Sequence, residues 1–314
     1  MTDPPHQRPS IPVRKPIDLR AVLLMLMLCL AWGFQQVAIK KVAMDIAPIM
    51  QLTLRFGFAA LFFASVVLVR EGRRSFADGS LRSGLVLGAL FSLEFVFVGE
   101  SLNYTSAAHS VVFLYSSPIF TALGMQFLPE EHLSLRQWGG IAVAFIGLAV
   151  AFLGYRTALV PHLLFGDLLA LLGGVTWGAA NVALRRGRIG STTAAKTVLY
   201  QVGTATVLLS VFAGVTGQTH VVPSTAAIVS VAFQTLVISI SSYLLWFWML
   251  RHYLTSRLML ISFLTPLFGV LFGAALLGDR VDANFGFGSV LVLAGILVVN
   301  APQGLGRARR SHTA

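Results

Sequence analysis

The sequence predicts an all-α multi-pass membrane protein, with ten transmembrane helices built as a 5+5 inverted-topology repeat. Three observations predict this class. The 314 residues are 56% hydrophobic and only 11% charged, with a mean hydropathy of +0.80. Apolar runs of about 20 residues, the length of a membrane-spanning helix, recur along the chain. Several short motifs of the first half also return, in the same order, in the second half.

The low content of charged residues excludes a soluble globular protein. A soluble domain carries roughly 25% charged residues because its surface faces water. The net charge of +11 does not indicate nucleic acid binding, because the basic residues lie between apolar runs and not on a soluble module. The only cysteine, Cys29, cannot form an intrachain disulfide. No Walker A or HExxH pattern occurs, so we expect no cofactor, no metal site and no catalytic residues.

Ten apolar stretches are long enough to span a membrane, since a spanning helix needs about 20 residues. They cover residues 20–39, 48–70, 81–103, 105–128, 135–155, 163–184, 194–215, 225–250, 255–277 and 284–301. Residues 1–19 and 303–314 are expected to be tails. We expect the first span to be retained, because Ala31-Trp32-Gly33-Phe34 is not a small-x-small signal-peptide cleavage site.

The distribution of Lys and Arg predicts that both tails are cytoplasmic, because cytoplasmic loops carry an excess of basic residues. With the N-terminus inside, 18 of the 23 basic residues fall in inside segments, and Arg55 lies within a span. The outside segments hold only Lys40, Lys41, Arg156 and Arg280. We therefore expect a protein of the cytoplasmic (inner) membrane, surrounded by lipid, with no nucleic acid partner.

Two distant stretches have nearly the same sequence. Residues 29–41 read CLAWGFQQVAIKK and residues 174–186 read GVTWGAANVALRR. Further pairs follow in the same order: Ser117-Pro118-Ile119-Phe120 with Thr265-Pro266-Leu267-Phe268, Glu131 with Asp279, and Gly140 with Gly288. Each repeat, 20–155 and 163–302, contains five spans. Because five is odd, the second repeat must cross the membrane in the opposite sense, and such repeats place a substrate site near the midplane between them.

These motifs resemble those of the EamA transporters in the drug/metabolite transporter superfamily. The resemblance rests on Trp32-Gly33, on APIMQLTLR at 47–55, on Tyr104-Thr105-Ser106-Ala107 with Pro118, and on the second-half copies. The resemblance covers about residues 20–302. Within the family, the sequence as a whole is most similar to the bacterial aromatic amino acid exporters. The resemblance implies two EamA repeats and movement of small metabolites without ATP hydrolysis. Relatives that exchange protons for cationic drugs keep a Glu in the first helix, and this chain has none there after Asp18.

Two charged residues inside predicted spans, Arg55 and Glu94, are candidate binding residues, because charges inside the hydrocarbon are costly. At 1.5 Å per residue they lie roughly 10 and 14 Å from the outer ends of adjacent antiparallel helices. This placement is compatible with a buried ion pair that merely neutralises itself. In the alternative interpretation, Arg55 receives a substrate carboxylate in a bidentate fork while Glu94 faces an amine or a proton.

Aromatic and amide side chains inside the later spans suit a ligand that resembles an amino acid. Such groups can stack on a variable side chain and hydrogen-bond a zwitterion. The alternative is that each of them packs between helices or lies at the membrane interface. The candidates are Tyr115, Trp177, Asn181, Tyr200, Gln201, Gln234, Ser242 and Trp246.

Pro118 and Pro266 lie at matching positions in the two repeats and are candidate hinges, because a proline inside a helix frees a carbonyl four residues back. Static kinks are the alternative interpretation. Gly174 with Gly178, and Gly269 with Gly273, form small-xxx-small patterns that we expect to pack helices within one chain.

The sequence therefore predicts an alternating-access carrier that exports amino acids, aromatic and other neutral ones, or similar small metabolites. A carrier of cationic drugs or polyamines is the main alternative, kept open by the acidic groups Glu94 and Glu100. An intramembrane enzyme is a remote alternative. The physiological substrate, proton coupling and oligomeric state are not encoded in any pattern we recognise.

Overall fold

A computed structural model describes residues 15–105, 107–128, 131–153, 162–186, 189, 192–278, 281 and 283–301. Every regular element in these ranges is helical. Nine of the described helical stretches are long and apolar enough to cross a membrane. The tenth span is made of two shorter helices, described below. The predicted class of an all-helical, ten-span membrane protein is confirmed. The two predicted tails, apart from residues 15–19, lie outside the described residues.

The first repeat contains α1 (Leu19–Lys41), α2 (Pro48–Glu71), α3 (Leu81–Ser101), α4 (Ala107–Leu114), α5 (Ser117–Met125) and α6 (Leu135–Leu153). The second contains α7 (Leu163–Arg186), α8 (Ala194–Thr216), α9 (Thr225–Phe233), a π-helix (Gln234–Ser242), α10 (Tyr243–His252), α11 (Thr255–Ile261), α12 (Leu264–Leu277) and α13 (Ala283–Asn300). The π-helix joins α9 and α10 into one span.

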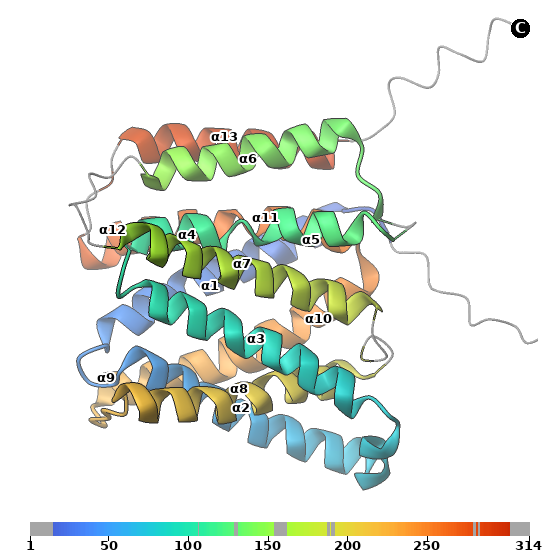
Figure 1. Cartoon of the computed structure of the whole chain (residues 1–314), viewed down its shortest axis with the longest axis vertical. Helices are drawn as coiled ribbons and strands as arrows, with labels where there is room; N and C mark the ends of the chain where they lie inside the picture. Colours follow the sequence, from blue (N-terminus) through green and yellow to red (C-terminus); the bar gives the residue numbers. More distant parts are fainter. Residues whose placement is uncertain are drawn as a thin grey trace, which may run out of the picture.

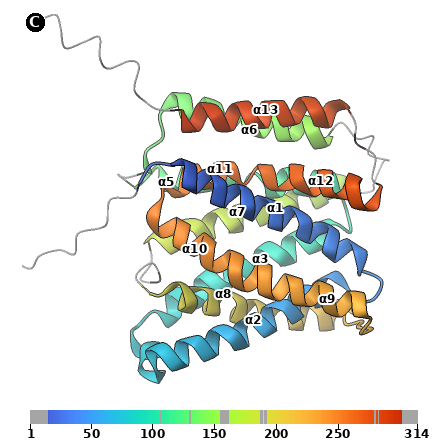
Figure 2. The same cartoon turned by 180° about the vertical axis from the view of Figure 1, so that it is seen from behind.

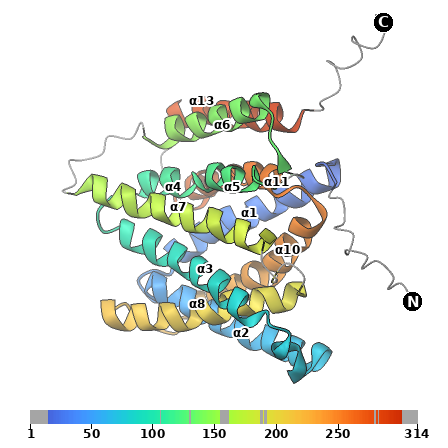
Figure 3. The same cartoon turned by 45° about the vertical axis from the view of Figure 1, so that its right-hand side comes forward.

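The helices lie roughly side by side, with α6 and α13 stacked at one edge of the bundle and α2 and α8 at the other (Figures 1 and 2). The start of α1 and the end of α13 lie on the same side of the bundle (Figure 3). We call this side, which carries Asp18 and Ala301, the terminal face, and the opposite side, which carries Asp167, the far face. Helix α1 starts at the terminal face and α7 at the far face, as the inverted repeat requires.

The fourth and ninth spans are each divided near their middle, where a continuous helix was expected. Helix α4 ends at Leu114 and α5 begins at Ser117; α11 ends at Ile261 and α12 begins at Leu264. Pro118 and Pro266 therefore lie in the first turn of a new helix and not in mid-helix. A proline is tolerated there because the first amides of a helix have no partner within it. Their role as hinges stays a prediction.

The repeated Trp-Gly motif packs each repeat's first helix against a divided span. A Cβ on Gly33 would lie 2.9 Å from Cβ of Phe268, and one on Gly178 would lie 2.7 Å from Cβ of Phe120. Phe120 and Phe268 are themselves equivalent in the sequence repeat. Only glycine allows this approach in either repeat. Gly269, which packs on Gly33, and Gly178 thus serve contacts within the chain, as expected.

The stack of α6 and α13 is built on four glycines, two from each helix. A Cβ on Gly288 would lie 2.4 Å from the carbonyl oxygen of Gly147, and one on Gly295 would lie 2.5 Å from that of Gly140. The contacts are between backbones, so no flexible side chain can move aside. This close approach joins the last helix of one repeat to the last helix of the other.

A buried cation, Lys196, joins α8 to the connection between α2 and α3 at the terminal face. Lys196 is 1% exposed, and its ammonium donates to Asp78 Oδ2 at 2.7 Å and to the carbonyl of Ser75. The hydrogen bonds from Lys196 and Ser80 lower the pKa of Asp78 to about 2. A fully buried ammonium needs such a counter-charge.

We expect Asp78→Asn to lower the free energy of unfolding by roughly 1–2 kcal/mol, because Lys196 loses its counter-charge while water at the half-exposed Asp78 compensates in part. A lowered folded-state pKa means that this stabilisation is present above about pH 4 and is lost as the pH falls toward 2. Thermal unfolding of the purified protein at pH 7 and at pH 3 checks both statements. An unchanged midpoint at pH 7 would contradict the first.

Candidate functional site

Arg55, in the middle of α2, is a buried cation with unused hydrogen-bond donors. It is 1% exposed, and among the described residues neither Nε nor Nη1 has a hydrogen-bond partner. Its Cζ atom lies 4.6 Å from the ring centre of Phe56 and 5.7 Å from that of Phe95. Aromatic faces attract a guanidinium but leave its in-plane donors unsatisfied. The guanidinium of Arg55 can therefore donate hydrogen bonds, in its own plane, to a planar anion such as a carboxylate.

Glu94, on α3, is the nearest acidic group to consider, and it is buried. No salt bridge joins it to Arg55 in the described structure, so the direct ion pair that the sequence allowed is not formed there. Glu94 nevertheless lies within electrostatic range of Arg55, of Tyr115 and of Tyr243. Two helices of the first repeat, α2 and α3, thus place opposite charges in one region without a direct salt bridge, and Tyr243 approaches the same region from the second repeat.

Aromatic rings form one wall of this region. The ring centres of Phe91 and Phe95 lie 5.4 and 5.3 Å from that of Phe56. Tyr243, at the start of α10, lies 5.9 Å from Phe91 and 6.5 Å from Phe56. Phe95 with Phe56 and Tyr243 with Phe91 pack edge-to-face, a favoured arrangement of aromatic rings, and the other two pairs are tilted. The wall therefore offers an apolar, aromatic surface next to a guanidinium.

The turns that divide the two broken spans bring hydroxyl groups into the middle of the bundle. Tyr115, in the first turn, packs edge-to-face on Trp177 at 5.4 Å. The Thr265 hydroxyl lies beside the Tyr115 hydroxyl but makes no hydrogen bond of normal geometry. Within the part of the chain that the structure describes, Ser117 Oγ is also buried without a partner. Ser117 and Thr265 are equivalent in the sequence repeat, so both repeats contribute an unused hydroxyl at the midplane.

Three other predicted binding residues, Asn181, Ser242 and Trp246, have partners within the protein. Trp32 Nε1 donates to Ser242 Oγ at 2.9 Å, and its ring packs edge-to-face on Trp246 at 5.8 Å. Asn181 Nδ2 donates to the carbonyl of Trp177 at 3.2 Å and contacts Met259 Sδ at 3.4 Å. These side chains have protein partners, so they offer few free groups to a ligand.

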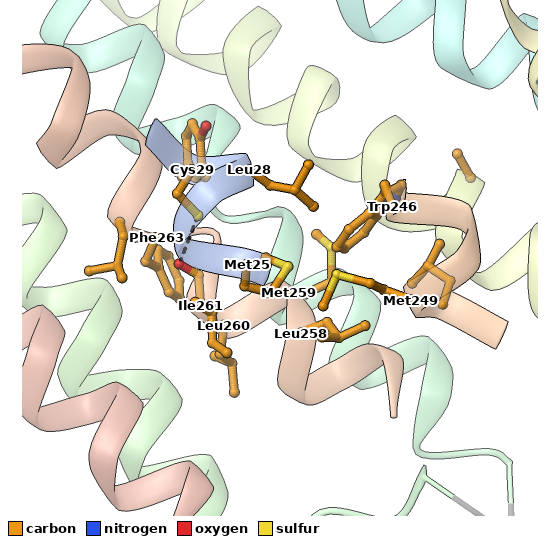
Figure 4. Close-up of a cluster of buried hydrophobic side chains, with 14 of the residues drawn as sticks. Met25, Leu28, Cys29, Trp246, Met249, Leu258, Met259, Leu260, Ile261 and Phe263 are labelled. Atoms are coloured by element: carbon orange, nitrogen blue, oxygen red, sulfur yellow. Dashed lines mark hydrogen bonds between the residues drawn. The ribbon is translucent and has the colours of Figure 1, made fainter. Parts of the chain in front are cut away.

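Figure 4 shows a cluster of buried apolar side chains from α1, α10 and α11. Met25 and Cys29 of α1 face α11, where the Cys29 thiol contacts the carbonyl of Ile261 at 3.5 Å. Trp246 and Met249 approach from α10. We call this cluster the apolar plug; its members are Met25, Leu28, Cys29, Trp246, Met249, Leu258, Met259, Leu260, Ile261 and Phe263. All are at most 8% exposed, so the plug seals the bundle on the terminal side.

The structure places the remaining predicted residues elsewhere. Tyr200 lies near the terminal face, where its hydroxyl is 3.2 Å from Ser80 Oγ. Gln234 Nε2 donates to Gln51 Oε1 at 2.9 Å, one turn farther toward the far face than Arg55. Gln201 is buried, and no described contact links it to Arg55. Tyr200 and Gln234 thus have structural partners of their own.

Sequence reasoning missed the aromatic wall and the π-helix. Phe91 and Phe95 are four residues apart on α3, one on each side of the turn that carries Glu94, and this spacing was the available signal. The π-helix Gln234–Ser242 widens the helix locally, so residues after it face a direction that a 3.6-residue period does not give. That shift brings Tyr243 to face Phe91. It also leaves Ser239 Oγ and Thr235 Oγ1 buried without partners.

An apolar groove of about 460 Å³ lies between α2 and α9 toward the far face. Its lining includes Leu54, Phe58, Ile228 and Val231 and presents no polar surface. Phe58 and Ile228 are also exposed on the outside of the bundle. This groove offers nothing to a charged ligand and is distinct from the region around Arg55.

The sequence matches a known family twice. The profile of the EamA-like transporter family fits residues 19–153 and again residues 164–301. The two matches together cover most of the chain and agree with its internal repeat.

Several curated proteins are related to the chain at low identity. A Bacillus subtilis protein named uncharacterized transporter YoaV is 22% identical over 285 residues, which is 89% of this chain and 96% of that protein. An Escherichia coli protein named probable amino-acid metabolite efflux pump is 25% identical over 288 residues, covering 88% and 93% of the two chains. A Salmonella typhimurium protein of the same name is 26% identical.

One protein of known crystal structure is 19% identical and superposes with a TM-score of 0.74. The match covers 89% of this chain and 97% of the other. The two proteins share the fold.

Proposed function

Because the chain belongs to the EamA-like transporter family, we propose that it exports amino acids, aromatic and other neutral ones, or similar small metabolites by alternating access. Membership makes it a membrane transporter, which acts on a small molecule. The substrate class is our proposal. It is supported by two relatives named probable amino-acid metabolite efflux pumps and by the chemistry around Arg55.

The observation that carries the proposal is the unsatisfied guanidinium of Arg55. Burying a charge with two unpartnered nitrogens costs free energy. The cation–π contacts of Arg55 with Phe56 and Phe95 compensate for only part of this cost. A carboxylate arriving with the substrate satisfies both nitrogens through charge-assisted hydrogen bonds. We assign the substrate carboxylate to Arg55.

The neighbours of Arg55 suit the rest of an amino acid. Glu94 supplies a negative charge for the ammonium group, since it lies near Arg55 without pairing to it. The wall of Phe56, Phe91, Phe95 and Tyr243 suits an aromatic or large apolar side chain. We therefore place Tyr115 and Trp177 at the edge of the site. Asn181, Ser242 and Trp246 form its terminal-side wall.

The proposal includes an orientation. The excess of Lys and Arg makes the terminal face cytoplasmic, in an inner membrane, with both tails inside. The apolar plug then closes the cytoplasmic side of the site. The turns before Pro118 and Pro266 allow the two halves of each divided span to move separately, which is the motion a hinge needs. Nothing in this scheme involves catalysis.

Counterflow in proteoliposomes tests the proposal. Purified protein is reconstituted with unlabelled amino acid inside, and labelled aromatic, neutral and basic amino acids are supplied outside, beside a panel of cationic dyes and polyamines. We expect saturable counterflow of aromatic and neutral amino acids, with little movement of the cations. Movement of cations without amino acids would favour the alternative, a carrier of cationic drugs or polyamines that uses Glu94. A pH gradient imposed in the same assay tests proton coupling.

A further inference from the structure

We infer that Glu131 and Arg185 form a latch that holds the carrier closed at the terminal face. Glu131 follows α5 in the first repeat, and Arg185 is near the end of α7 in the second. The two side chains form a salt bridge in which they are only 1% and 3% exposed. Of the salt bridges that the described residues form between the two repeats at this face, this pair is the more buried, since Asp78 in the other pair is 43% exposed.

The latch also includes the start of α11. Glu131 Oε1 accepts a hydrogen bond from the backbone amide of Thr255 at 2.9 Å. Its other oxygen accepts from the amide and the hydroxyl of Ser256, at 3.1 and 2.8 Å. Arg185 Nε donates to Thr255 Oγ1 at 2.7 Å. One carboxylate, which follows the end of the fourth span, is therefore tied to the start of the ninth, and these are the two spans that are divided at the midplane.

The position of the latch assigns its role. Helices α5 and α11 are the terminal-side halves of the divided spans, and α11 carries Leu258, Met259 and Ile261 into the apolar plug. Separating α5 from α11 would open the plug, and this cannot happen while Glu131 holds Thr255 and Ser256. Opening therefore requires the latch to break, and loss of the latch shifts the population toward the state open at the terminal face.

Arg185, the cation of the latch, is the first residue of the basic pair that ends the second copy of the repeated stretch. Arg185 corresponds to Lys40 in the first copy, and Glu131 corresponds to Asp279 in the second half. The sequence thus contains the same combination of charges twice. Asp279 lies outside the described residues, and the inference rests on Glu131 and Arg185 alone.

A contact at the far face provides a comparison. Asp167 in α7 accepts a hydrogen bond from Thr105 Oγ1 at 2.6 Å and lies 3.1 Å from His109 Nδ1. It joins the two repeats as Glu131 does, but on the opposite side. Substitution of carboxylate by amide is expected to increase opening at the terminal face at Glu131 and not at Asp167.

Cys29 supplies the readout, because it is the only cysteine and lies in the apolar plug. Wild-type protein and the variants Glu131→Gln and Asp167→Asn are embedded in vesicles that expose the terminal face, and the rate of labelling by a membrane-impermeant maleimide is measured. We expect Glu131→Gln to raise the rate at least about fivefold, the lower end of typical coupling between conformational states. Asp167→Asn should leave it equal or lower. Cys29→Ser gives the background.

Two further variants keep the test decisive. Glu71→Gln changes a carboxylate at the same face that accepts a 2.5 Å hydrogen bond from Thr193 Oγ1 but is not part of the latch, and it should label at the wild-type rate. Ser256→Ala removes a single hydrogen bond and should give a smaller rise, even if Glu131→Gln does not fold. Wild-type labelling in every folded variant at Glu131 and Ser256 would overturn the inference. The inference rests on the proposed alternating access, but labelling needs no substrate, so a wrong substrate class would not affect it.

Discussion

Arg55→Gln is expected to reduce amino acid counterflow by roughly 100-fold or more, because a bidentate charge-assisted contact to a buried carboxylate contributes about 3 kcal/mol. The same substitution should leave the thermal stability of the substrate-free protein equal or higher. In that state Arg55 is a buried cation with two unpartnered nitrogens, so its removal relieves a desolvation cost. Counterflow and thermal unfolding of the same preparation check the two parts together.

Conservative and matched variants separate binding from general damage. Arg55→Lys keeps the charge but loses the planar fork, so we expect intermediate counterflow with a raised KM. Arg70→Gln removes a cation from the last turn of the same helix, where it is exposed, and should transport like the wild type. If Arg55→Gln lost activity only in proportion to lost folded protein, Arg55 would be structural and the proposed carboxylate contact would be wrong.

Gly288→Val is expected to cost about 3 kcal/mol or more of stability, at the upper end of the range for overpacking. The new Cβ would lie 2.4 Å from the carbonyl oxygen of Gly147 and 2.5 Å from the amide nitrogen of Ala151. Both are backbone atoms of α6, so the two helices must separate. A large fall in the unfolding temperature in detergent is the expected result.

Glycines of the same helices with open surroundings provide the control. Gly139 in α6 and Gly286 in α13 have no neighbouring atom within 4 Å of the place that a Cβ would occupy. Alanine at either site should leave the unfolding temperature equal or raise it, since alanine favours a helix over glycine. Equal losses at Gly286 and Gly288 would mean that helix propensity, and not the close contact of α6 with α13, decides stability here.

The spans and their duplication could be predicted from sequence because lipid imposes strict requirements. A chain in hydrocarbon must form helices of about 20 apolar residues, so run lengths alone located the spans. The repeated Trp-Gly motif was informative for a similar reason. Gly33 and Gly178 both meet a phenylalanine of a divided span, so each repeat needs glycine at that position.

The geometry of the site could be predicted only in part. Arg55 and Glu94 stood out as charges inside spans, but depth along a helix does not give rotation about it, and the direct ion pair is not formed. The divisions before Pro118 and Pro266 depend on packing against α7 and α1, which a proline in the sequence does not reveal. The π-helix changes the direction of every residue after Ser242, so periodicity could not place Tyr243 on the aromatic wall.

The most direct test of the central claim compares L-phenylalanine with L-phenylalaninamide as inhibitors of labelled phenylalanine counterflow. The two ligands share the ring and the amine, but the amide has no carboxylate for Arg55. We predict that the acid inhibits the wild-type protein at least about 100-fold more strongly, the effect of one charge-assisted bidentate contact, and that Arg55→Gln removes the difference. Equal inhibition of the wild type by both ligands would contradict the claim that Arg55 binds the substrate carboxylate.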